Sequence, residues 1–431
     1  MARGGSLRQD GRRFLLLSLA FPPDANSTAQ LFGEMVEDLV AQGWRVDVVT
    51  TRPHNNPPQG NSGTQHLTGL WGGLLAKSNF RGATVWHTAM PMKGNNIAVR
   101  IGGWLGFHFL SIVAAWLKVG KIDVILAPSP PLSIGVAAWM IGLLKRAPFI
   151  YNVQELFPDT AVSLGALGDG SFLNLLRRIE GFVYDRSFAV TAIAPGMVRA
   201  IGGRVEDARK VRLIPNFVDT QIIAPRPRDN SFSREYGLTD RFTVVYAGNM
   251  GPAQGLEILL DAAELTRDDE RIMYVFVGDG TMRGQLERSA RSRLLPNVLF
   301  IPQQPYVRVP EIYGASDLCI VPLASSLVAE AVPSKVYRIM AAERRILAIA
   351  ASKSDLAGVV RDSGAGIVVN PGDPRALTDA IRRAAERPDP AEGRLGREYV
   401  VQHVGRERIT KEYAELLADA VTQRGSERRL T

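Results

Sequence analysis

The sequence of 431 residues has a single cysteine and only five histidines. One cysteine excludes an intramolecular disulfide. Because Cys319 stands in the apolar segment LCIVPL, we interpret it as a buried, inert thiol in a protein of a reducing compartment. No H-x-x-H, D-x-D or cysteine pair has compelling spacing for metal ligands. We therefore expect a cytoplasmic protein without a metal site and without a bound cofactor.

The sequence also lacks a long apolar segment free of charge. Residues 97–119 are numerous enough to span a bilayer, but they contain Arg100, His108 and Lys118 together with glycines that weaken a helix. Residues 132–144 are too few to span. We interpret both segments as helices packed on a sheet. The alternative is that aromatic residues of the first segment touch lipid; they are Trp104, Phe107, Phe109 and Trp116.

The N-terminal run FLLLSLAF follows Arg12 and Arg13 and therefore looks like an export signal. The run is short, and no small-residue cleavage site follows before FPPD. We interpret it as the first buried strand of the fold.

The formal net charge is +8, which indicates a partner that carries negative charge. Nucleic acid is disfavoured, because no RNP-like, zinc-finger or helix-turn-helix pattern is present and the arginines are not interleaved with aromatic residues. An anionic membrane surface and phosphorylated substrates account for the same charge.

Length and periodicity favour two α/β domains, since single hydrophobic cores stop growing near about 250–300 residues. Strand-like and helix-like segments alternate through the first half, as in a doubly wound sheet. The segment APRPRDNS has linker composition, which places a boundary near residue 225. The predicted strands of the first half are residues 14–20, 45–50, 122–127, 148–153 and 189–194.

A glycine-rich turn, GNMGPAQG, begins at Gly248 between the apolar run FTVVYA and an amphipathic helical pattern. Such a strand–turn–helix unit removes side chains where backbone N–H groups and a helix N-terminus converge, which is how phosphate is held without a metal. The alternative is a purely structural turn.

Three further segments follow this turn: YVFVGDG from Tyr274, LCIVPL ending at Leu323, and EAVPSKVYRIMAAE from Glu330. Together the four segments resemble the nucleotide-sugar half of retaining GT-B glycosyltransferases, in particular the bacterial colanic acid and O-antigen biosynthesis subgroup. The resemblance implies two Rossmann-like domains facing a central cleft. Residues 1–224 would bind the acceptor, residues 225–392 would bind the nucleotide sugar, and residues 393–431 would return to the first domain.

The resemblance also implies which residues bind the donor. Many relatives carry Arg and Lys at the positions of Asn249 and Gln254, whereas both residues here are neutral. The positive charge that stabilises the diphosphate would therefore come mainly from Lys335, which lies beside the helix start at Ser334. The predicted donor-binding residues are Gly248, Asn249, Gly251, Gln254, Gly278, Ser334, Lys335 and Arg338.

Glu330 matches the first glutamate of the E-x7-E motif of the family, which implies a bond to the donor sugar. The second glutamate of that motif is replaced by Arg338, which donates hydrogen bonds but cannot accept them. Ser334 and Arg338 are four residues apart and should share a helix face. The A-A-G-x-P pattern that follows is also altered, because Glu343 replaces glycine and Arg345 replaces proline. A catalytically degenerate homologue that only binds sugar nucleotides is therefore an alternative.

On the acceptor side the segment QELFPD contains Glu155 and Asp159, which the resemblance implies as contacts for the acceptor or the transferring sugar. With Glu330 they form the predicted catalytic set. The alternative is that either carboxylate only caps a loop.

The expected activity is metal-independent, retaining transfer from a UDP- or GDP-sugar to a glycan acceptor that is soluble or linked to polyprenyl diphosphate, in surface polysaccharide biosynthesis. The enzyme would work in the cytoplasm, with peripheral contact at the inner membrane face. A UDP-N-acetylglucosamine 2-epimerase shares this architecture, but it needs a proton-abstracting group that the sequence does not display.

Overall fold

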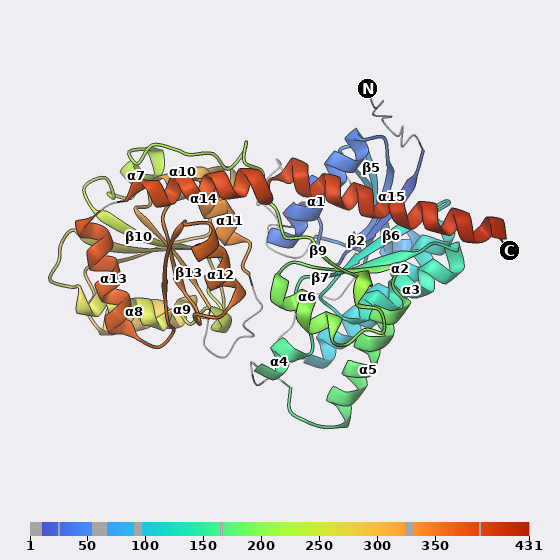
Figure 1. Ribbon diagram of the computed structural model, residues 1–431, viewed down its shortest axis with the longest axis horizontal. Helices are drawn as coiled ribbons and strands as arrows, with labels where there is room; N and C mark the ends of the chain where they lie inside the picture. Colours follow the sequence, from blue (N-terminus) through green and yellow to red (C-terminus); the bar gives the residue numbers. More distant parts are fainter. Residues whose placement is uncertain are drawn as a thin grey trace. The chain divides into compact units, whose positions relative to one another are not determined.

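The computed structural model describes residues 11–24, 26–53, 67–89, 97–163, 165, 167–323, 332–387 and 389–430. The chain forms two compact units (Figure 1). The first comprises Met1–Asp159, Leu167–Pro215 and Ile409–Thr431, and the second comprises Thr160–Ala166 and Asn216–Arg408. The predicted α/β class is confirmed in both units. The domain limits at residues 224 and 392 stay a prediction.

Among its described residues the first unit has one nine-stranded sheet, in the order β3-β4-β5-β2-β1-β6-β7-β8-β9. All five residues of β6 and of β7 are buried, as expected for parallel strands covered on both faces. The strands are β1 (Arg13–Leu17), β2 (Arg45–Thr51), β3 (Thr68–Leu70), β4 (Leu75–Phe80), β5 (Ala83–Thr88), β6 (Val124–Pro128), β7 (Phe149–Val153), β8 (Ala189–Ala192) and β9 (Val211–Leu213).

The edge made by β3 and β4 differs from the predicted doubly wound sheet, because β4 runs antiparallel to both β3 and β5. These strands are short and half exposed, so their apolar alternation is weak in the sequence. The predicted first strand is confirmed, since β1 pairs in parallel with β2 and β6.

Helices of the first unit connect these strands. The helix α1 begins after Asn26, whose side chain accepts a hydrogen bond of 2.7 Å from the backbone N–H of Ala29. The helices are α1 (Ser27–Ala41), α2 (Ile97–Leu117), α3 (Ser133–Lys145), α5 (Ser171–Arg186) and α6 (Pro195–Gly202); α4 (Asp159–Ser163) and α15 (Arg406–Leu430) each include residues assigned to both units.

The end of the chain packs into the first unit through a buried polar contact. Asn152, at the end of β7, donates hydrogen bonds from Nδ2 to the hydroxyl of Tyr413 in α15 (2.9 Å) and to Thr191 (2.8 Å). Its Oδ1 accepts one from Gln154 at 2.7 Å. Both N–H groups and the oxygen of this amide therefore have partners, and the bond to Tyr413 ties α15 to the sheet.

The second unit has a six-stranded parallel sheet within its described residues, in the order β12-β11-β10-β13-β14-β15. Its strands are β10 (Phe242–Ala247), β11 (Ile272–Val277), β12 (Val298–Ile301), β13 (Leu318–Pro322), β14 (Ile346–Ile349) and β15 (Gly366–Val369). Its helices are α7 (Ser231–Glu235), α8 (Glu257–Leu265), α9 (Arg283–Ser292), α10 (Val309–Gly314), α11 (Lys335–Ala341), α12 (Asp355–Asp362), α13 (Pro374–Glu386) and α14 (Pro390–His403).

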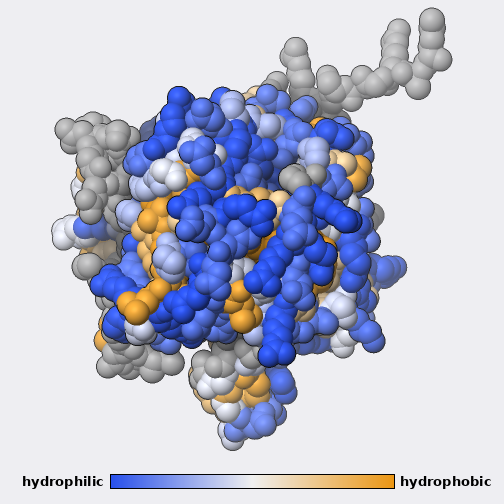
Figure 2. All heavy atoms as spheres, turned by 90° about the vertical axis from the view of Figure 1, so that its left-hand side faces the viewer, coloured by the Kyte–Doolittle hydropathy of each residue, from blue (hydrophilic) through white to orange (hydrophobic). Residues whose placement is uncertain are grey.

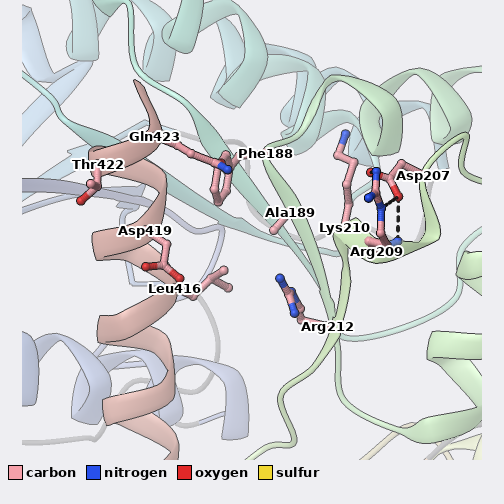
Figure 3. Close-up of a pocket in the computed structure, with 10 residues that line it drawn as sticks. All are labelled: Phe188, Ala189, Asp207, Arg209, Lys210, Arg212, Leu416, Asp419, Thr422 and Gln423. Carbon is pink, nitrogen blue, oxygen red and sulfur yellow. Dashed lines mark hydrogen bonds and ion pairs between the residues drawn. The ribbon is translucent and has the colours of Figure 1, made fainter. Parts of the chain in front are cut away.

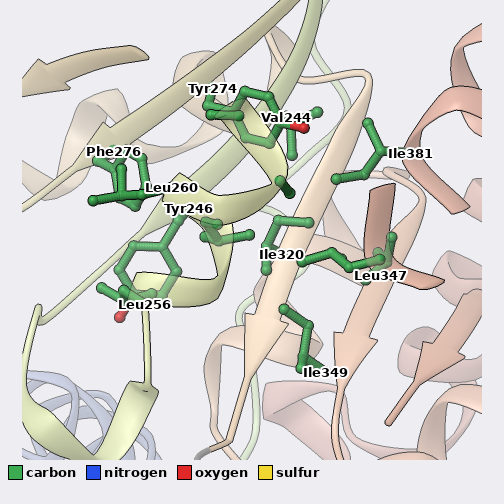
Figure 4. Packing of buried hydrophobic residues seen from close by; sticks show 14 of the residues in the cluster. Val244, Tyr246, Leu256, Leu260, Tyr274, Phe276, Ile320, Leu347, Ile349 and Ile381 are labelled. Carbon is green, nitrogen blue, oxygen red and sulfur yellow. The ribbon is translucent and has the colours of Figure 1, made fainter. Parts of the chain in front are cut away.

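The main core of the second unit lies on one side of this sheet (Figure 4), where Val244, Tyr246, Ile320, Leu347 and other strand residues pack against the helices α8 and α13. The predicted buried thiol is confirmed: Cys319 in β13 is inaccessible, and burial raises its pKa to about 12. On the side of the molecule presented in Figure 2, hydrophilic residues cover most of the surface and hydrophobic ones form small separate patches.

Both apolar segments predicted as helices are confirmed as α2 and α3. Within the described part of the chain, no helix combines the length and apolar character needed to cross a membrane.

Candidate functional site

The strand order of the second unit reverses between β10 and β13, so a topological switch point lies at the carboxyl ends of these two strands. The chain proceeds from β10 outward to β11 and β12, and then returns to β13 on the other side of β10. The connections on the two sides of this point leave in opposite directions, and ligands of open α/β sheets bind there. Gly248 directly follows β10, and Lys335 begins α11, the next described helix after β13.

The turn after β10, which begins at Gly248, and the turn after β11, which begins at Gly278, approach each other closely through their backbones. A Cβ atom on Gly278 would lie 2.0 Å from the carbonyl oxygen of Gly248, and one on Gly280 would lie 2.4 Å from that of Met250. The N–H of Gly248 donates to Val277 (2.9 Å) and that of Met250 donates to Asp279 (2.8 Å). The glycines are needed because no side chain fits between these backbones.

These hydrogen bonds modify the predicted phosphate cradle. The N–H of Gly251 donates to Oε1 of Gln254 at 3.0 Å, so three of the four amides from Gly248 to Gly251 already have acceptors within the unit. Gln254 closes its own turn, and the carbonyl of Asn249 accepts a hydrogen bond from the hydroxyl of Tyr246. The turn therefore sets the shape of the site, while the positive charge comes from elsewhere.

Lys335 supplies that charge at the glycine turn. Its Nζ lies 4.0 Å from the ring centroid of Tyr246, and a Cβ on Gly248 would lie 3.0 Å from it. Burial, together with the nearby positive charge of Arg338, lowers the pKa of Lys335 to about 7. Removing the ammonium group from water costs free energy, and the aromatic ring offsets only part of this cost. A bound anion would offset more of it and would therefore stabilise the charged lysine.

Arg338 lies one helical turn further along α11. Its guanidinium sits 5.5 Å from the ring centroid of Tyr306, which begins a 3-10 turn (Tyr306–Arg308) after β12. Ser334 precedes the helix in a helical conformation, and its side chain makes no capping hydrogen bond. The structure thus brings together Gly248, Gly278, Lys335 and Arg338.

Tyr246 is a site residue that the sequence analysis missed. Its position in the run FTVVYA is that of an ordinary buried strand residue, and only the packing shows that its ring contacts Lys335. Glu330 lies outside the described residues, so its predicted contact stays a prediction.

The altered segment after α11 keeps a left-handed helix end. Glu343 has φ +58°, although this conformation favours glycine, and its N–H donates to Met340 at 2.9 Å. Arg344 donates to the carbonyls of Tyr313 and Gly314, and Arg345 pairs with Glu392. Both arginines therefore have partners within the second unit, and the altered segment is packed into its fold.

We predict that Glu343→Gly raises the thermal midpoint of the second unit. Relief of the left-handed strain is worth about 1 kcal/mol, which corresponds to about 2–4 °C for a unit of this size. Glu343→Ala is the matched control, because it removes the carboxylate but keeps the Cβ atom. A similar rise in both variants would show that charge, and not backbone strain, limits stability here.

In the first unit, Glu155 is exposed just beyond β7, whereas Asp159 is held by arginine. Arg204 pairs with Asp159 and donates to both oxygens of Glu180 (3.2 and 3.3 Å); Glu180 is 2% exposed, and burial raises its pKa. Asp159 is therefore part of a partly buried ion network within the first unit that includes Glu180 of α5. This arrangement favours a structural role for Asp159 and leaves Glu155 as the more accessible of the two carboxylates.

A separate hollow of about 590 Å³ lies in the first unit between β9 and α15 (Figure 3). Arg212 and Asp419 point into it from opposite sides. Two of its other basic groups are occupied within the protein: Arg209 pairs with Asp207, and Lys210 donates to the carbonyl of Asp185 at 2.7 Å. None of the predicted site residues lines this hollow.

Comparison with known proteins assigns both halves of the chain. Residues 229–398 match the family described as Glycosyl transferases group 1, and residues 28–216 match the Glycosyl transferase 4-like domain. WcaI of Escherichia coli K12, whose name refers to glycosyl transfer in colanic acid biosynthesis, is 25% identical over 415 residues, which cover 93% of this chain and 98% of WcaI. WbjE of Pseudomonas aeruginosa, named as a glycosyltransferase, is 25% identical over 280 residues, which cover 64% of this chain and 70% of WbjE.

Solved structures with the same architecture are more distant in sequence. Sucrose-phosphate synthase from Thermosynechococcus elongatus matches with a TM-score of 0.74 and 18% identity, over 96% of this chain and 100% of that one. HepE from Anabaena, in complex with UDP-glucose, matches with a TM-score of 0.70 and 15% identity, over 94% of this chain and 99% of HepE. At these identities the likeness concerns the fold.

Proposed function

The chain belongs to the GT-B glycosyltransferases of group 1, which act in glycan biosynthesis, and on that premise we propose that it transfers a sugar from a UDP- or GDP-sugar to a glycan acceptor. The predicted GT-B fold and the predicted resemblance to the colanic acid subgroup are confirmed. Retention of the anomeric configuration and independence of a metal ion are further parts of the proposal.

The observation that carries the proposal is Lys335. In a transfer from a nucleoside diphosphate sugar, negative charge grows on the diphosphate as the sugar leaves, so a positioned cation lowers the barrier. Lys335 lies at the crevice end of the sheet, beside the glycine turn and over Tyr246. In this role its ammonium group stabilises the departing diphosphate, and the close contact of the two turns keeps other side chains out of the space that the phosphates need.

Arg338 would contact the nucleotide beside Lys335. Its guanidinium lies next to the ring of Tyr306. The guanidinium can donate hydrogen bonds to ribose oxygens, and the aromatic ring can stack on a nucleobase. The HepE complex with UDP-glucose makes this donor the first to test here.

For the acceptor we propose a glycan, soluble or linked to polyprenyl diphosphate, with Glu155 as the contact from the first unit. Glu155 is exposed, whereas Asp159 is partly buried beside Arg204. Replacing Glu155 by glutamine should therefore impair transfer more than hydrolysis or binding of the donor.

A second candidate function is binding of a sugar nucleotide without turnover. The observation in its favour is Arg338, which stands where the family motif has its second glutamate. The two functions differ in a simple way: both predict nucleotide binding, but only the enzyme releases nucleoside diphosphate when donor and acceptor are present.

The test is a thermal-shift panel of UDP, GDP, ADP and their common sugar conjugates without added metal, since a ligand that binds only the folded state raises the melting temperature. We expect one nucleotide family to stabilise the protein, and we expect Glu330→Ala to lose the extra stabilisation due to the sugar. Release of nucleoside diphosphate with extracts of lipid-linked glycans then separates transferase from binding protein. If no nucleotide raises the melting temperature, the donor-site assignment is wrong.

We predict that Arg338→Glu moves the pH dependence of nucleotide binding upward by about one pH unit. The variant replaces a repulsive charge near Lys335 by an attractive one, and such a change raises a lysine pKa by about 1–3 units. Arg338→Gln is the control, because it removes the repulsion without adding attraction and should shift the profile less. Titration of UDP against each variant from pH 6 to 9 measures this, and coincident profiles would show that the two side chains do not interact.

A further inference from the structure

Helix α2 carries a row of large apolar side chains that face solvent. Leu105, Phe109 and Trp116 are 62%, 67% and 59% exposed. Their spacing of four and seven residues places them on one face of the helix, over about 16 Å of its length. On the same helix, Cβ atoms on Gly102 and Gly106 would meet no atom within 4 Å, so this face is open.

Helix α3 lies beside α2 (Figure 1) and carries a second such row: Met140, Leu143 and Leu144 are 42%, 60% and 50% exposed. The helices are joined by a contact of 2.8 Å between His108 and Ser133. They are joined again where Lys145 donates to the carbonyl of Val119 at 2.7 Å. We refer to the six exposed residues of these two adjacent helices as the apolar face of the first unit: Leu105, Phe109, Trp116, Met140, Leu143 and Leu144.

The structure of α2 separates the four aromatic residues for which lipid contact was the alternative interpretation. Phe107 is inaccessible and belongs to the core, and Trp104 is half-buried, whereas Phe109 and Trp116 face outward. The alternative of lipid contact is therefore wrong for Phe107, and it is compatible with the structure for Phe109 and Trp116.

The segment that carries the apolar face has almost no negative charge, although the neighbouring helix α5 has an exposed acid, Asp185. Residues 97–154 contain a single acidic side chain, Asp123. Asp123 is 9% exposed and is engaged by the N–H of Arg13 (2.9 Å) and by Lys121 (3.1 Å). Near the C-terminal ends of the two helices, Lys118 and Arg146 are exposed. An outward Trp and Phe, flanked by basic groups and without an exposed acid on either helix, match the interfacial region of an anionic bilayer.

We propose that the apolar face of α2 and α3 binds the surface of a membrane containing anionic phospholipid. Phe109 and Trp116 enter the headgroup region, and Lys118 and Arg146 contact lipid phosphates. Among the described residues no helix is suited to span the bilayer, so the contact is one of a helix pair lying in the interface. The proposal is independent of the donor site, since it rests on other elements and on other chemistry.

The test is flotation of the full-length protein with vesicles of phosphatidylcholine alone and of phosphatidylcholine mixed with phosphatidylglycerol. We expect binding to the mixed vesicles that weakens as salt is raised. The double variant Phe109→Ser with Trp116→Ser should bind at least about tenfold more weakly, because two exposed apolar side chains no longer leave water. Lys118→Glu with Arg146→Glu should lose about tenfold on the mixed vesicles only.

The matched control is Leu265→Ser with Val401→Ser, which replaces two residues of the second unit that are 46% and 52% exposed. This control should bind vesicles as the wild type does, and unchanged thermal midpoints in all variants would show that folding is intact. Equal vesicle binding by the wild type and the Phe109 and Trp116 variant would overturn the proposal. It would also be overturned if wild-type dimers formed without vesicle binding and these substitutions separated them, because the face would then join two copies of the chain. Flotation needs no nucleotide, so failure of the donor-site assignment would leave its outcome unchanged.

Discussion

Lys335→Met is expected to weaken the binding of a nucleoside diphosphate by about 10- to 100-fold at pH 6.5, as typical of one lost charge-assisted hydrogen bond. The structure gives the reason: the ammonium group lies over Tyr246, at the turn that begins with Gly248. Lys353→Met is the matched control, because it removes one positive charge from an exposed position of the same unit. Isothermal titration with UDP and GDP measures both variants.

The same lysine should make wild-type binding depend on pH. Its pKa in the free protein is about 7, so at higher pH it must take up a proton to bind the diphosphate as a cation. The dissociation constant should therefore rise by up to about tenfold per pH unit above 7, whereas that of Lys335→Met should vary less. A flat wild-type profile, with equal affinities for Lys335→Met and Lys353→Met, would remove Lys335 from the donor site.

Stability should change in the opposite direction from binding. The folded pKa of Lys335 is below the ordinary lysine value of about 10.4, so the unfolded chain binds more protons between pH 7 and that value. This lysine therefore destabilises the fold most below pH 7, and the cost is relieved as pH rises through this range. Lys335→Met should raise the thermal midpoint below pH 7, and the gain should shrink toward pH 9. Such a trade of stability for affinity is common at binding sites.

Gly278→Ala is expected to lower the free energy of unfolding of the second unit by about 3–5 kcal/mol. The added Cβ would lie 2.0 Å from the carbonyl oxygen of Gly248, and Gly278 has φ +141°. Backbone at the centre of the sheet must move to accept it, because the strands β10 and β11 on both sides are paired along their whole length. The thermal midpoint should fall by about 10 °C.

Gly372→Ala is the control for this change, because Gly372 has φ +84° and a Cβ there would meet no atom within 4 Å. It should lose only about 1 kcal/mol, the cost of left-handed backbone for alanine. If the two variants lose equal stability, the close approach of the two glycine turns does not limit the fold. If Gly278→Ala also abolishes nucleotide binding at temperatures where it stays folded, the turn contributes to the site as well as to stability.

The architecture could be predicted from the sequence, because the signals for it are local. The apolar runs that became β1, β10 and β11, the glycines that follow β10 and β11, and the helix beginning at Lys335 are all readable from short segments. A strand buried on both faces and a turn without side chains each restrict the residue types at adjacent positions, so they leave a pattern along the chain. The hairpin of β3 and β4 left no such pattern, since half of its residues face water.

The accessibility and the partners of the candidate site residues could not be predicted in this way, because they depend on contacts between distant parts of the chain. Asp159 and Glu155 look alike in the segment QELFPD, but Asp159 is partly buried beside Arg204, which is 45 residues away in the chain, and Glu155 is exposed. Gln254, a predicted donor-binding residue, also has a role within its own turn, because its Oε1 accepts the N–H of Gly251. Tyr246 has the sequence context of a core residue, and its ring contacts the ammonium group of Lys335. Phe107 and Phe109 are the same residue type two positions apart, but they lie on opposite faces of α2, one buried and one exposed. The hydrogen-bond partners, the burial and the pKa of a side chain depend on residues that folding brings together from distant parts of the chain. Such contacts produce no periodic pattern in the sequence around either residue.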